Sequence, residues 1–358
     1  MRVLIVSGSS GGHIFPAIAL TEALKKIALD ALLVLPQKSL KDRMAVDSKG
    51  IKYIPAAVLS FNFTSKNISG IYFFLWGIWE SFRLIIKFKP DIVVGFGSLN
   101  TVALIFWAWL FRIKTIIHEQ NVVCGKANRL LSKLVDRVAI AFSQTRAGLN
   151  IADAKIVLTG NPLRSNLFRI NKKEALDYFK FKEGKFTIFI TGGSQGAHRL
   201  NVACFEALAA YEQKADLQVI HICGTQDFAC LQSDYAASGL TYKLFDFLPQ
   251  MQYAYSLADL IICRAGATTI AELAKFRVPA ILVPYPFAYA HQSANAQVLK
   301  EIGAAEVLLD RDLCAHKIKE KFQEYFYHHE KLVEMRTAYQ KLPDLDATTM
   351  LVNLVLSG

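Results

Sequence analysis

The sequence predicts an α/β protein made of two doubly wound domains that face a central cleft. Three observations support this prediction. The chain has 358 residues, 53% of them hydrophobic and 20% charged, which is long and apolar enough for two cores. Short apolar runs alternate with helical patterns, as in parallel sheets built from β-α-β units. Finally, segments 5–24 and 188–208 share one pattern: an apolar run, a glycine turn with serine, and a helix.

The predicted strands are short apolar runs bounded by glycine, proline or polar residues. They lie at 3–7, 31–35, 91–96, 114–118, 137–142 and 155–160, and then at 186–191, 217–223, 242–247, 260–265 and 280–285.

The domain boundary is predicted at Asn161-Pro162, because the residue before proline disfavours helix and Gly160 precedes the pair. We therefore expect an N-terminal domain over 1–160 and a C-terminal domain over 161–343. A last helix, about 344–358 and capped by Asp344 or Asp346, is expected to return to the first domain.

The stretch from Ile92 to Phe111 has no charged residue and meets a crude length criterion for a membrane span. Its GFGSLN segment at 95–100 indicates instead a buried strand, a loop and a buried helix over Thr101–Phe111. A first strand beginning at residue 2 or 3 leads us to expect no targeting peptide. The six cysteines include no CxxC pair, so we expect free thiols in a reducing cytoplasm.

The positive charge is confined to the first half of the chain. Residues 1–160 contain 20 Lys and Arg against 9 Asp and Glu, whereas residues 161–358 contain 21 of each kind. The net charge of +11 therefore lies entirely in the first half, which we expect to meet an anionic partner. A surface that only keeps the protein soluble is the alternative.

The first glycine turn is SGSSGGH at 7–13, between a predicted strand and a predicted helix. Backbone N–H groups of such a turn converge on an anion, and the dipole of the following helix favours negative charge. The turn is neither the GxGxxG of nicotinamide enzymes nor a P-loop. His13 is a candidate for catalysis or for contact with a diphosphate; the alternative is a histidine that only hydrogen-bonds a loop.

Two further polar loops follow predicted strands in the basic half, GFGSLN at 95–100 and HEQN at 118–121. Ligands of open α/β sheets bind beyond the carboxyl ends of the strands, so we expect both loops at the site. Glu119 is a candidate catalytic carboxylate, and Asn121 is suited to a sugar hydroxyl. Turn formation is the alternative role for these residues.

Arg164, in GNPLR at 160–164, follows a strand, a turn and a proline at the expected domain junction. A guanidinium there is suited to pair with a leaving phosphate, although a lone arginine is more often a surface residue. A second glycine turn, TGGSQG at 191–196, offers Ser194 and Gln195 as donors. Two such turns indicate two phosphate-bearing ligands, or one diphosphate approached from both sides.

A third turn, RAGATT at 264–269, leads into a helix whose first turns carry Glu272. A carboxylate there can accept two hydrogen bonds from a ribose diol; the alternative is a carboxylate that stabilises the helix dipole. His291-Gln292 follows the next predicted strand, and the glutamine amide offers both a donor and an acceptor to sugar hydroxyls.

Six motifs occur in this order: GSSGGHIFPA, HEQN-x4-KANR, GNPLR, GGSQGAHRLN, RAGATTIAEL and HQSANA. Together they resemble the family 28 glycosyltransferases of bacterial peptidoglycan synthesis over nearly the whole chain. The resemblance implies a GT-B fold, with two Rossmann-like domains around a cleft. It also implies inverting transfer of N-acetylglucosamine from UDP-N-acetylglucosamine to the 4-hydroxyl of N-acetylmuramic acid in undecaprenyl-diphosphoryl-MurNAc-pentapeptide (lipid I), which forms lipid II.

The resemblance assigns roles to residues of this chain. His13 matches a histidine proposed to assist catalysis, Glu272 the ribose carboxylate, and Gln292 the residue that reads the sugar hydroxyls. Contacts to UDP-N-acetylglucosamine are expected at Ser10, Gly11, Gly12, Asn121, Arg164, Ser194, Gln195, Leu248 (by its backbone, near the uracil), Ala267, Thr268, Thr269, Glu272 and Gln292. The diphosphate of the acceptor is expected at Gly11, Gly12, His13, Gly97 and Ser98.

Two loops depart from the family pattern. The segment before His291 reads PYPFAYAHQ and lacks an acidic pair common in the family, so we expect the sugar contacts there to differ. GFGSLN stands on the presumed acceptor side, where a GGY-type sequence is common. Two D-x-D sequences, 310–312 and 344–346, look like metal motifs of other glycosyltransferases, but both flank predicted helix starts, where Asp caps are expected. We expect no metal and no other cofactor.

The segment 61–90 mixes aromatic residues and isoleucine with Lys66, Arg83, Lys87 and Lys89. An apolar patch rimmed by cations is typical of peripheral binding to anionic lipid, here expected at the cytoplasmic face of the inner membrane. The alternative is that 71–86 is a helix packed on the sheet.

Two other functions remain as alternatives: a GT-B transferase with another glycolipid acceptor, and a UDP-sugar-binding scaffold without turnover. HEQN together with HQSANA argues against the first alternative. We expect no nucleic-acid partner, because the chain has no helix-turn-helix, RNP-type or basic-aromatic motif.

Overall fold

The computed structural model describes residues 1–358 except 9, 37–52, 57–67, 194–195, 287–290 and 358. The chain forms two compact units, Met1–Ser165 with Leu345–Gly358, and Asn166–Asp344. The first unit extends past the predicted boundary at residue 160 for a local reason. The Arg164 guanidinium lies 4.6 Å from the centre of the Phe15 ring, and Ser165 Oγ donates to Glu22 at 3.0 Å.

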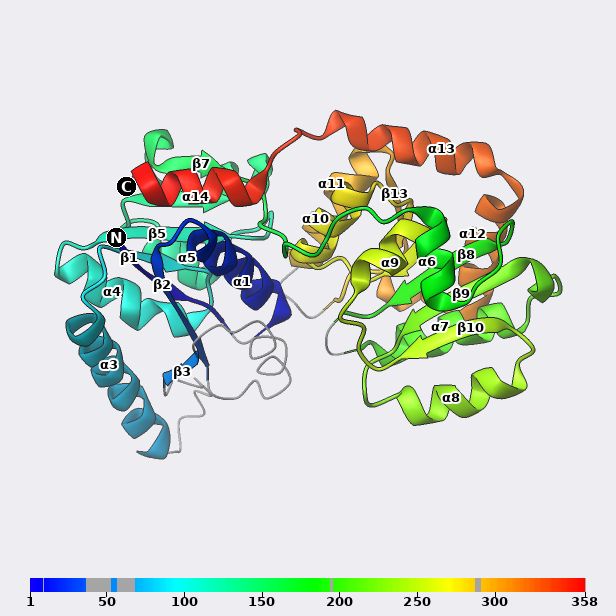
Figure 1. The fold of residues 1–358 in the computed structure, drawn as a ribbon, viewed down its shortest axis with the longest axis horizontal. Helices are drawn as coiled ribbons and strands as arrows, with labels where there is room; N and C mark the ends of the chain where they lie inside the picture. Colours follow the sequence, from blue (N-terminus) through cyan, green and yellow to red (C-terminus); the bar gives the residue numbers. More distant parts are fainter. Residues whose placement is uncertain (9, 37–52, 57–67, 194–195, 287–290, 358) are drawn as a thin grey trace. The chain divides into compact units, whose positions relative to one another are not determined.

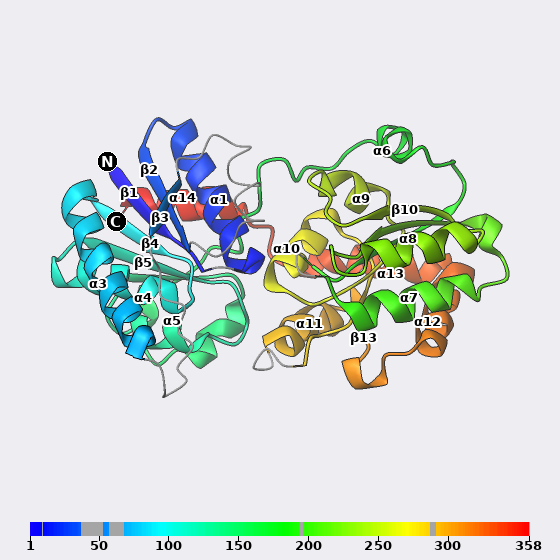
Figure 2. The same cartoon turned by 90° about the horizontal axis from the view of Figure 1, so that it is seen from below.

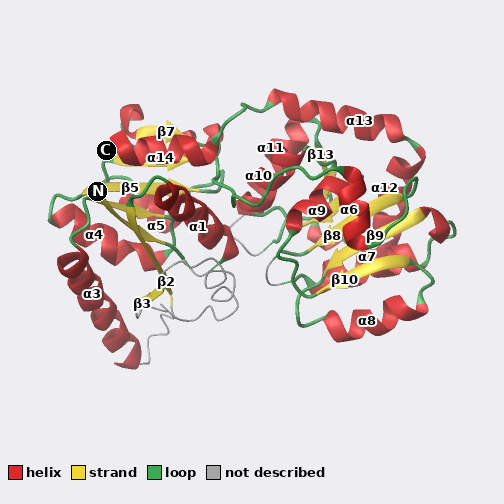
Figure 3. Cartoon of the chain, viewed as in Figure 1, coloured by secondary structure: helices red, strands yellow, loops and turns green. Residues whose placement is uncertain are grey.

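The first unit is a parallel sheet with helices on both faces (Figures 1 and 3). Its elements are β1 (Arg2–Val6), α1 (Gly11–Lys26), β2 (Asp30–Pro36), β3 (Tyr53–Ala56), α3 (Ile68–Phe88), β4 (Ile92–Gly95), η1 (Leu99–Thr101), α4 (Val102–Leu110), β5 (Lys114–Glu119), α5 (Lys126–Leu131), β6 (Arg137–Ile140), η2 (Ser143–Gly148), η3 (Asp153–Lys155), β7 (Ile156–Leu158) and α14 (Ala347–Ser357). The strand order is β3-β2-β1-β4-β5-β6-β7.

Alternation along β1 explains why this sheet needs two helical layers. Val3 and Ile5 point into the cluster formed with α1 and α14, and Leu4 and Val6 point into the cluster formed with α3, α4 and α5. Successive side chains of a strand face opposite sides of the sheet, and all four are fully buried. A strand that is apolar on both faces is the usual signature of a parallel sheet.

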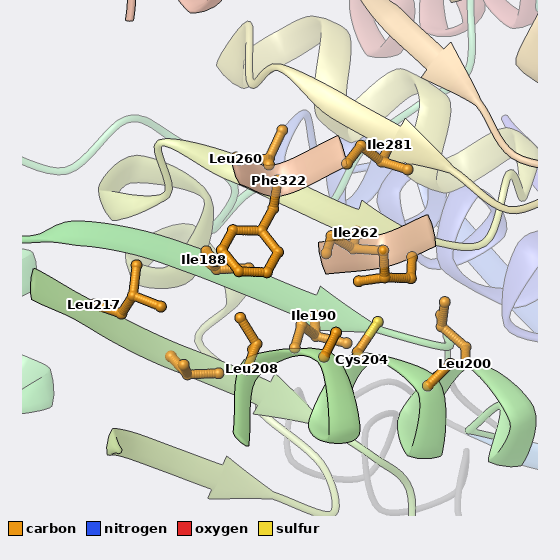
Figure 4. Packing of buried hydrophobic residues seen from close by; sticks show 14 of the residues in the cluster. Ile188, Ile190, Leu200, Cys204, Leu208, Leu217, Leu260, Ile262, Ile281 and Phe322 are labelled. Atoms are coloured by element: carbon orange, nitrogen blue, oxygen red, sulfur yellow. The ribbon is translucent and has the colours of Figure 1, made fainter. Parts of the chain in front are cut away.

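The second unit repeats this plan. Its elements are α6 (Lys172–Phe179), β8 (Phe186–Thr191), α7 (His198–Ala209), η4 (Lys214–Asp216), β9 (Leu217–Ile222), α8 (Phe228–Ala237), β10 (Thr241–Phe245), α9 (Met251–Leu257), β11 (Leu260–Cys263), α10 (Ala267–Phe276), β12 (Ala280–Leu282), α11 (His291–Ile302), β13 (Ala305–Val307), η5 (Asp310–Asp312), α12 (Ala315–Tyr327), α13 (His329–Ala338) and η6 (Tyr339–Lys341). The parallel strand order is β10-β9-β8-β11-β12-β13. Figure 4 shows α7 and Phe322 of α12 packed on one face of this sheet.

The uncharged stretch from Ile92 to Phe111 forms β4, η1 and α4, as predicted. Among the helices that the described residues form, none has the length and hydropathy needed to span a membrane. Two short strands were not predicted. β3 contains a proline and lies at the edge of its sheet, and β13 is the three-residue edge strand Ala-Glu-Val, so neither has a typical apolar run.

The last helix, α14, belongs to the first unit, although the whole second unit intervenes in the sequence. Leu351, Leu354 and Val355 pack in the cluster that holds α1 and one face of the sheet. α14 lies beside α1 (Figures 1 and 2). The predicted cap is confirmed at Asp346, whose Oδ1 accepts from the Thr349 amide at 3.1 Å.

Candidate functional site

Each sheet has a switch point, where the strand order changes direction. In the first unit, β1 and β4 are neighbours, and the chain winds outward from them on either side. In the second unit, the neighbouring strands β8 and β11 form the corresponding switch point. Open α/β sheets bind ligands beyond the carboxyl ends of such strands. The described residues of the first two glycine turns, 7–8 with 10–13 and 95–100, therefore flank one switch point. Those of the other two turns, 191–193 with 196 and 264–269, flank the other.

His13 lies at the switch point of the first unit, in the first turn of α1. A Cβ added to Gly8 would lie 2.9 Å from His13 Cδ2, and a Cβ added to Gly97 would lie 3.3 Å from His13 Cε1. The same Gly8 position faces Ser98 Cβ at 2.6 Å. A side chain at Gly8 would clash with the imidazole ring and with Ser98, and at Gly97 both the close contact and the positive φ favour glycine. The structure brings His13, Gly97 and Ser98 together, as the positions of their loops predict.

The loop that begins at Gly97 has an unusual backbone. Gly97 has φ +81° and Ser98 has φ +74°, which is rare for a residue with a Cβ. Such strain is typically retained at ligand-binding and catalytic sites. The first turn of α1 carries no acidic residue, so no carboxylate of its own offsets the positive end of the helix dipole. These features suit an anion at this edge of the sheet.

Glu119 is 2% exposed and holds the loop after β5. Its Oε1 accepts from the Asn121 amide at 3.0 Å and from Asn121 Nδ2 at 3.2 Å. Its Oε2 accepts from the Gly125 amide at 3.0 Å and from Asn128 Nδ2 at 2.9 Å. Four donors on a buried carboxylate are typical of a residue that organises a turn. The catalytic role of Glu119 stays a prediction, and Asn121 takes part in the same turn.

Glu272 lies within α10 and is 6% exposed. Its Oε2 accepts a 2.7 Å hydrogen bond from the hydroxyl of Tyr255 on α9. The first turn of α10 contains no acidic residue, so the alternative role for Glu272, a carboxylate that stabilises the helix dipole, is wrong. The helix begins at Ala267 with Gly266 as its N-cap and no capping side chain, as at α1.

Gln292, on the first turn of α11, differs from its predicted use. Its Oε1 accepts from the Ala265 amide at 3.1 Å and from the Tyr285 amide at 2.9 Å. Backbone N–H groups can only donate, so the orientation of the side-chain amide is fixed. The oxygen predicted to accept a hydrogen bond from a sugar hydroxyl is therefore already bonded to two backbone amides. Only the N–H groups of Nε2 are left to bind a sugar.

The first D-x-D sequence is a charge cluster. Asp310 is 7% exposed, and its Oδ1 accepts from Arg264 Nη1 at 2.6 Å, while Oδ2 pairs with Arg199. Asp310 was expected to cap a helix, which is wrong, because α12 begins at Ala315 after Cys314. Within the described part of the chain, no three His, Cys, Asp or Glu side chains are grouped so as to hold a metal ion.

Comparison with known proteins identifies the family. Residues 3–140 match the Glycosyltransferase family 28 N-terminal domain, and residues 187–349 match the Glycosyltransferase family 28 C-terminal domain. The chain belongs to glycosyltransferase family 28. Both halves of the family's architecture are thus present, in the order that the motifs predicted.

Relatives cover the chain from end to end. A protein of Halothermothrix orenii is 34% identical over 99% of this chain and 98% of its own length. It is curated as UDP-N-acetylglucosamine--N-acetylmuramyl-(pentapeptide) pyrophosphoryl-undecaprenol N-acetylglucosamine transferase. A protein of the same name from Thermodesulfovibrio yellowstonii is 36% identical over 94% of this chain and 93% of its own length.

The fold agrees with that of a solved family member. The crystal structure of MurG from Acinetobacter baumannii matches with a TM-score of 0.76 and 27% identity, over 100% of both chains. The predicted GT-B fold is confirmed, and the chain is a family 28 glycosyltransferase.

The remaining predicted residues are placed as follows. Ser194 and Gln195 lie outside the described residues. Ala267, Thr268 and Thr269 form the first turn of α10, and Leu248 is buried in the segment between β10 and α9. Arg164 lies in the first unit, over the Phe15 ring. Ser10, Gly11 and Gly12 form the start of α1, where the Ser10 carbonyl accepts the His13 and Ile14 amides.

Two polar residues of the site were not predicted. Gln120 stands in the HEQN motif, and its amide contacts His13 and His118. Tyr255 stands in an apolar helical segment and contacts Glu272. The sequence signals for Gln120 are its place in a loop after a strand and in the HEQN motif, neither of which indicates its partner His13. Tyr255 has no signal at all, because a tyrosine at helical spacing is typical of a core.

Proposed function

We propose that this chain transfers N-acetylglucosamine from UDP-N-acetylglucosamine to the 4-hydroxyl of the N-acetylmuramoyl group of lipid I. The product is lipid II, the disaccharide precursor of peptidoglycan. The full-length similarity to the relatives of that activity supports the substrates. The observation that carries the chemistry is the polar group at each switch point: His13 beside glycine turns in one unit, and Glu272 with Gln292 in the other.

The second unit binds the donor in this proposal. The diphosphate lies at the N-terminus of α10, formed by Ala267, Thr268 and Thr269, where helix dipole and backbone amides favour negative charge. Glu272 accepts hydrogen bonds from the ribose hydroxyls, and the backbone at Leu248 contacts the uracil. Gln292 donates from Nε2 to an oxygen of the sugar. The further donor contacts proposed are those at Ser10, Gly11, Gly12, Asn121, Arg164, Ser194 and Gln195.

The first unit carries the acceptor and the base. His13 takes the proton of the acceptor 4-hydroxyl as its oxygen attacks the anomeric carbon from the face opposite UDP. The new C–O bond forms as the bond from the anomeric carbon to the diphosphate breaks, and the configuration inverts. Negative charge develops on the leaving UDP, where Arg164 and the glycine-turn amides stabilise it. Gly11, Gly12, Gly97 and Ser98 are proposed to hold the acceptor diphosphate.

The acceptor tail places the enzyme at a membrane, and one surface of the first unit suits that location. We define the aromatic surface as Trp76, Trp79, Phe106, Trp109, Leu110 and Phe111, each at least 41% exposed. Ring contacts run from Trp79 through Phe82 and Phe111 to Trp107, and on to Phe106 and Trp109.

Exposed cations lie on the same segments as the aromatic surface: Arg83 and Lys87 on α3, and Arg112 directly after Phe111. Arg83 also lies 3.9 Å from Glu80. Anionic lipid attracts such cations by about 1 kcal/mol each, and indole rings favour the interface between lipid and water. The proposed location is therefore peripheral, on the cytoplasmic face of the inner membrane.

The test is release of UDP from UDP-N-acetylglucosamine, with and without a short-chain lipid I analogue, and with UDP-N-acetylgalactosamine as the control donor. We expect release that depends on the acceptor and on the N-acetylglucosamine donor. The His13→Ala variant should lose about 100-fold or more in kcat, and Glu272→Ala should raise KM for the donor. Release with a different glycolipid acceptor, but not with the lipid I analogue, would contradict the proposed substrate.

A further inference from the structure

A chain of hydrogen bonds links the backbone at Gly160 to the ring of His13. The Gly160 carbonyl lies 2.9 Å from His118 Nε2, and His118 Nδ1 lies 3.1 Å from Gln120 Nε2. Gln120 Oε1 lies 2.9 Å from His13 Nδ1. His118 is fully buried and Gln120 is 1% exposed, so no bulk water competes for these groups. All four residues belong to the first unit.

Two carbonyl groups decide which way the Gln120 amide points. Nε2 lies 3.2 Å from the carbonyl oxygen of Phe96 and 3.1 Å from that of His118. With the amide reversed, Oε1 would face two acceptors inside the protein, and two buried carbonyls would lose a donor. Nitrogen must therefore face the carbonyls, and Oε1 must face His13.

The positions of the protons follow from this orientation. Oε1 only accepts, so His13 Nδ1 must donate the bond between them. A neutral imidazole has one N–H, which leaves the lone pair of His13 on Nε2. At the other end, the Gly160 carbonyl only accepts, so His118 donates from Nε2 and accepts at Nδ1 from Gln120. Gln120 Nε2 has two hydrogens, so one is donated to His118 Nδ1 and the other is left for the two carbonyls. One arrangement of protons therefore satisfies each hydrogen bond from Gly160 to His13.

The series of hydrogen bonds from Gly160 to His13 keeps this arrangement of protons at neutral pH. Burial lowers the pKa of His118 to about 4, so its ring is neutral. The ring of His13 is also held by its neighbours. Cβ atoms at Gly8 and Gly97 would crowd Cδ2 and Cε1, the two carbons on either side of Nε2.

We propose that Gln120 is a positioning residue that sets the tautomer of His13, so that Nε2 takes the proton of the acceptor hydroxyl. The proposal rests on the proposed function of His13 as the base. In this proposal Gln120 acts through His13 and makes no hydrogen bond to a substrate itself. A base in the other tautomer would present an N–H to the hydroxyl and could not accept its proton.

The first test uses the unaltered full-length protein. It is labelled with ¹⁵N in the histidine rings, and the His13 signals are identified by their loss in a His13→Asn variant. We expect a neutral ring protonated at Nδ1 and unprotonated at Nε2. A proton on Nε2 in the neutral ring would overturn the proposal. The spectrum is recorded without any assay of sugar transfer. It therefore tests the tautomer of His13 even if the proposed function is wrong.

The second test is Gln120→Met, which keeps the length of the side chain and removes its acceptor. We expect the His13 signals to shift towards the other tautomer and kcat to fall about 10- to 100-fold, with KM for UDP-N-acetylglucosamine within about twofold. The control is Gln232→Met, at an exposed position of α8, which should change neither the His13 signals nor kcat and KM. A changed tautomer with unchanged kcat would overturn the proposal. If Gln120→Met does not fold, the spectrum of the unaltered protein decides.

Discussion

The hydroxyl of Tyr255 donates a 2.7 Å hydrogen bond to Oε2 of Glu272, joining α9 to α10. Tyr255 is 2% exposed, and its ring is held by Phe276, at 5.1 Å between centroids, and by Phe189, at 5.4 Å. One oxygen of the carboxylate therefore has a fixed direction before a ligand binds. In the proposed donor site, a carboxylate held in this way binds the ribose without the cost of ordering its own side chain.

Removal of the Tyr255 hydroxyl should weaken donor binding. Tyr255→Phe keeps the ring, and we expect KM for UDP-N-acetylglucosamine to rise about tenfold, because a hydrogen bond to a charged group contributes about 1.5–3 kcal/mol. Steady-state kinetics checks this. Tyr253→Phe, on the same helix, removes a hydroxyl bonded to exposed Glu174 and is the control. An equal KM in the two variants would show that Tyr255 does not support the ribose site.

Exchange of one atom tests the orientation of Gln292. Gln292→Glu retains oxygens for the Ala265 and Tyr285 amides but replaces the donor nitrogen. We expect KM for the donor to rise about tenfold while inhibition by UDP alone stays within about twofold. Gln297→Glu places the same charge at an exposed site of α11 and should have no effect. Loss of UDP inhibition in Gln292→Glu would instead indicate repulsion of the diphosphate.

Asp310 should matter for stability. In Asp310→Asn, Arg264 loses its buried counter-charge, so we expect the free energy of unfolding to fall by about 3 kcal/mol. Urea unfolding followed by circular dichroism measures this. Asp312→Asn is the matched control, since Asp312 is 40% exposed and its ion pairs are 3.9–4.0 Å long. Its loss should be within about 0.5 kcal/mol. Comparable losses in both variants would contradict a buried ion-pair role for Asp310.

Stability of the first unit should depend on pH through His118. Burial lowers its pKa from 6.5 to about 4, so between these values the unfolded chain binds a proton that the folded protein does not. Unfolding free energy should therefore fall with falling pH, with a contribution of up to about 1.4 kcal/mol per unit from this histidine.

The tryptophans make this slope measurable. All four lie in the first unit, so their fluorescence during urea unfolding reports on that unit. His118→Phe should have a smaller slope between pH 5 and 6.5, by about one bound proton, whatever its absolute stability. His316→Phe, at an exposed site of α12, should keep the slope of the unaltered protein. An unchanged slope in His118→Phe would rule out this histidine as its source.

The aromatic surface should bind anionic vesicles. The Trp76→Ser, Trp79→Ser double variant is expected to sediment less with such vesicles and to bind UDP-N-acetylglucosamine normally, because burial of large apolar side chains supplies binding energy at the interface. The control changes Phe168 and Tyr327 to serine. These side chains are 54% and 56% exposed on the second unit. Unchanged sedimentation of a folded Trp76, Trp79 variant would remove this surface from the membrane proposal.

The sheets could be predicted from sequence because their strands are apolar on both faces. A run such as Val3–Val6 between polar or glycine residues has few other interpretations. β3 and β13 lie at sheet edges, where an apolar run is not required. The boundary after residue 165 depends on Arg164 packing over Phe15, a contact between segments far apart in the sequence.

The positions of the candidate site's loops could be predicted where the backbone conformation needs particular residues, such as glycine. Glycine turns follow the strands at both switch points, and at the first of them a Cβ at Gly8 or Gly97 would crowd the ring of His13. Side-chain partners were not predictable in this way. Gln120 and His13 are 107 positions apart, and the acceptor of Gln292 is taken up by two backbone amides of other loops. Pairings of this kind follow from the fold and have no local pattern.

The return of α14 to the first unit has a consequence for synthesis on the ribosome. The apolar surface beside α1 is covered by Leu351, Leu354 and Val355, which are translated after the whole second unit. The second unit is contiguous in sequence and can complete its core before these residues are made, whereas the first unit cannot. The N-terminal part of the nascent chain thus waits with apolar surface uncovered while the second unit is synthesised, and we expect chaperone protection to matter most for that part.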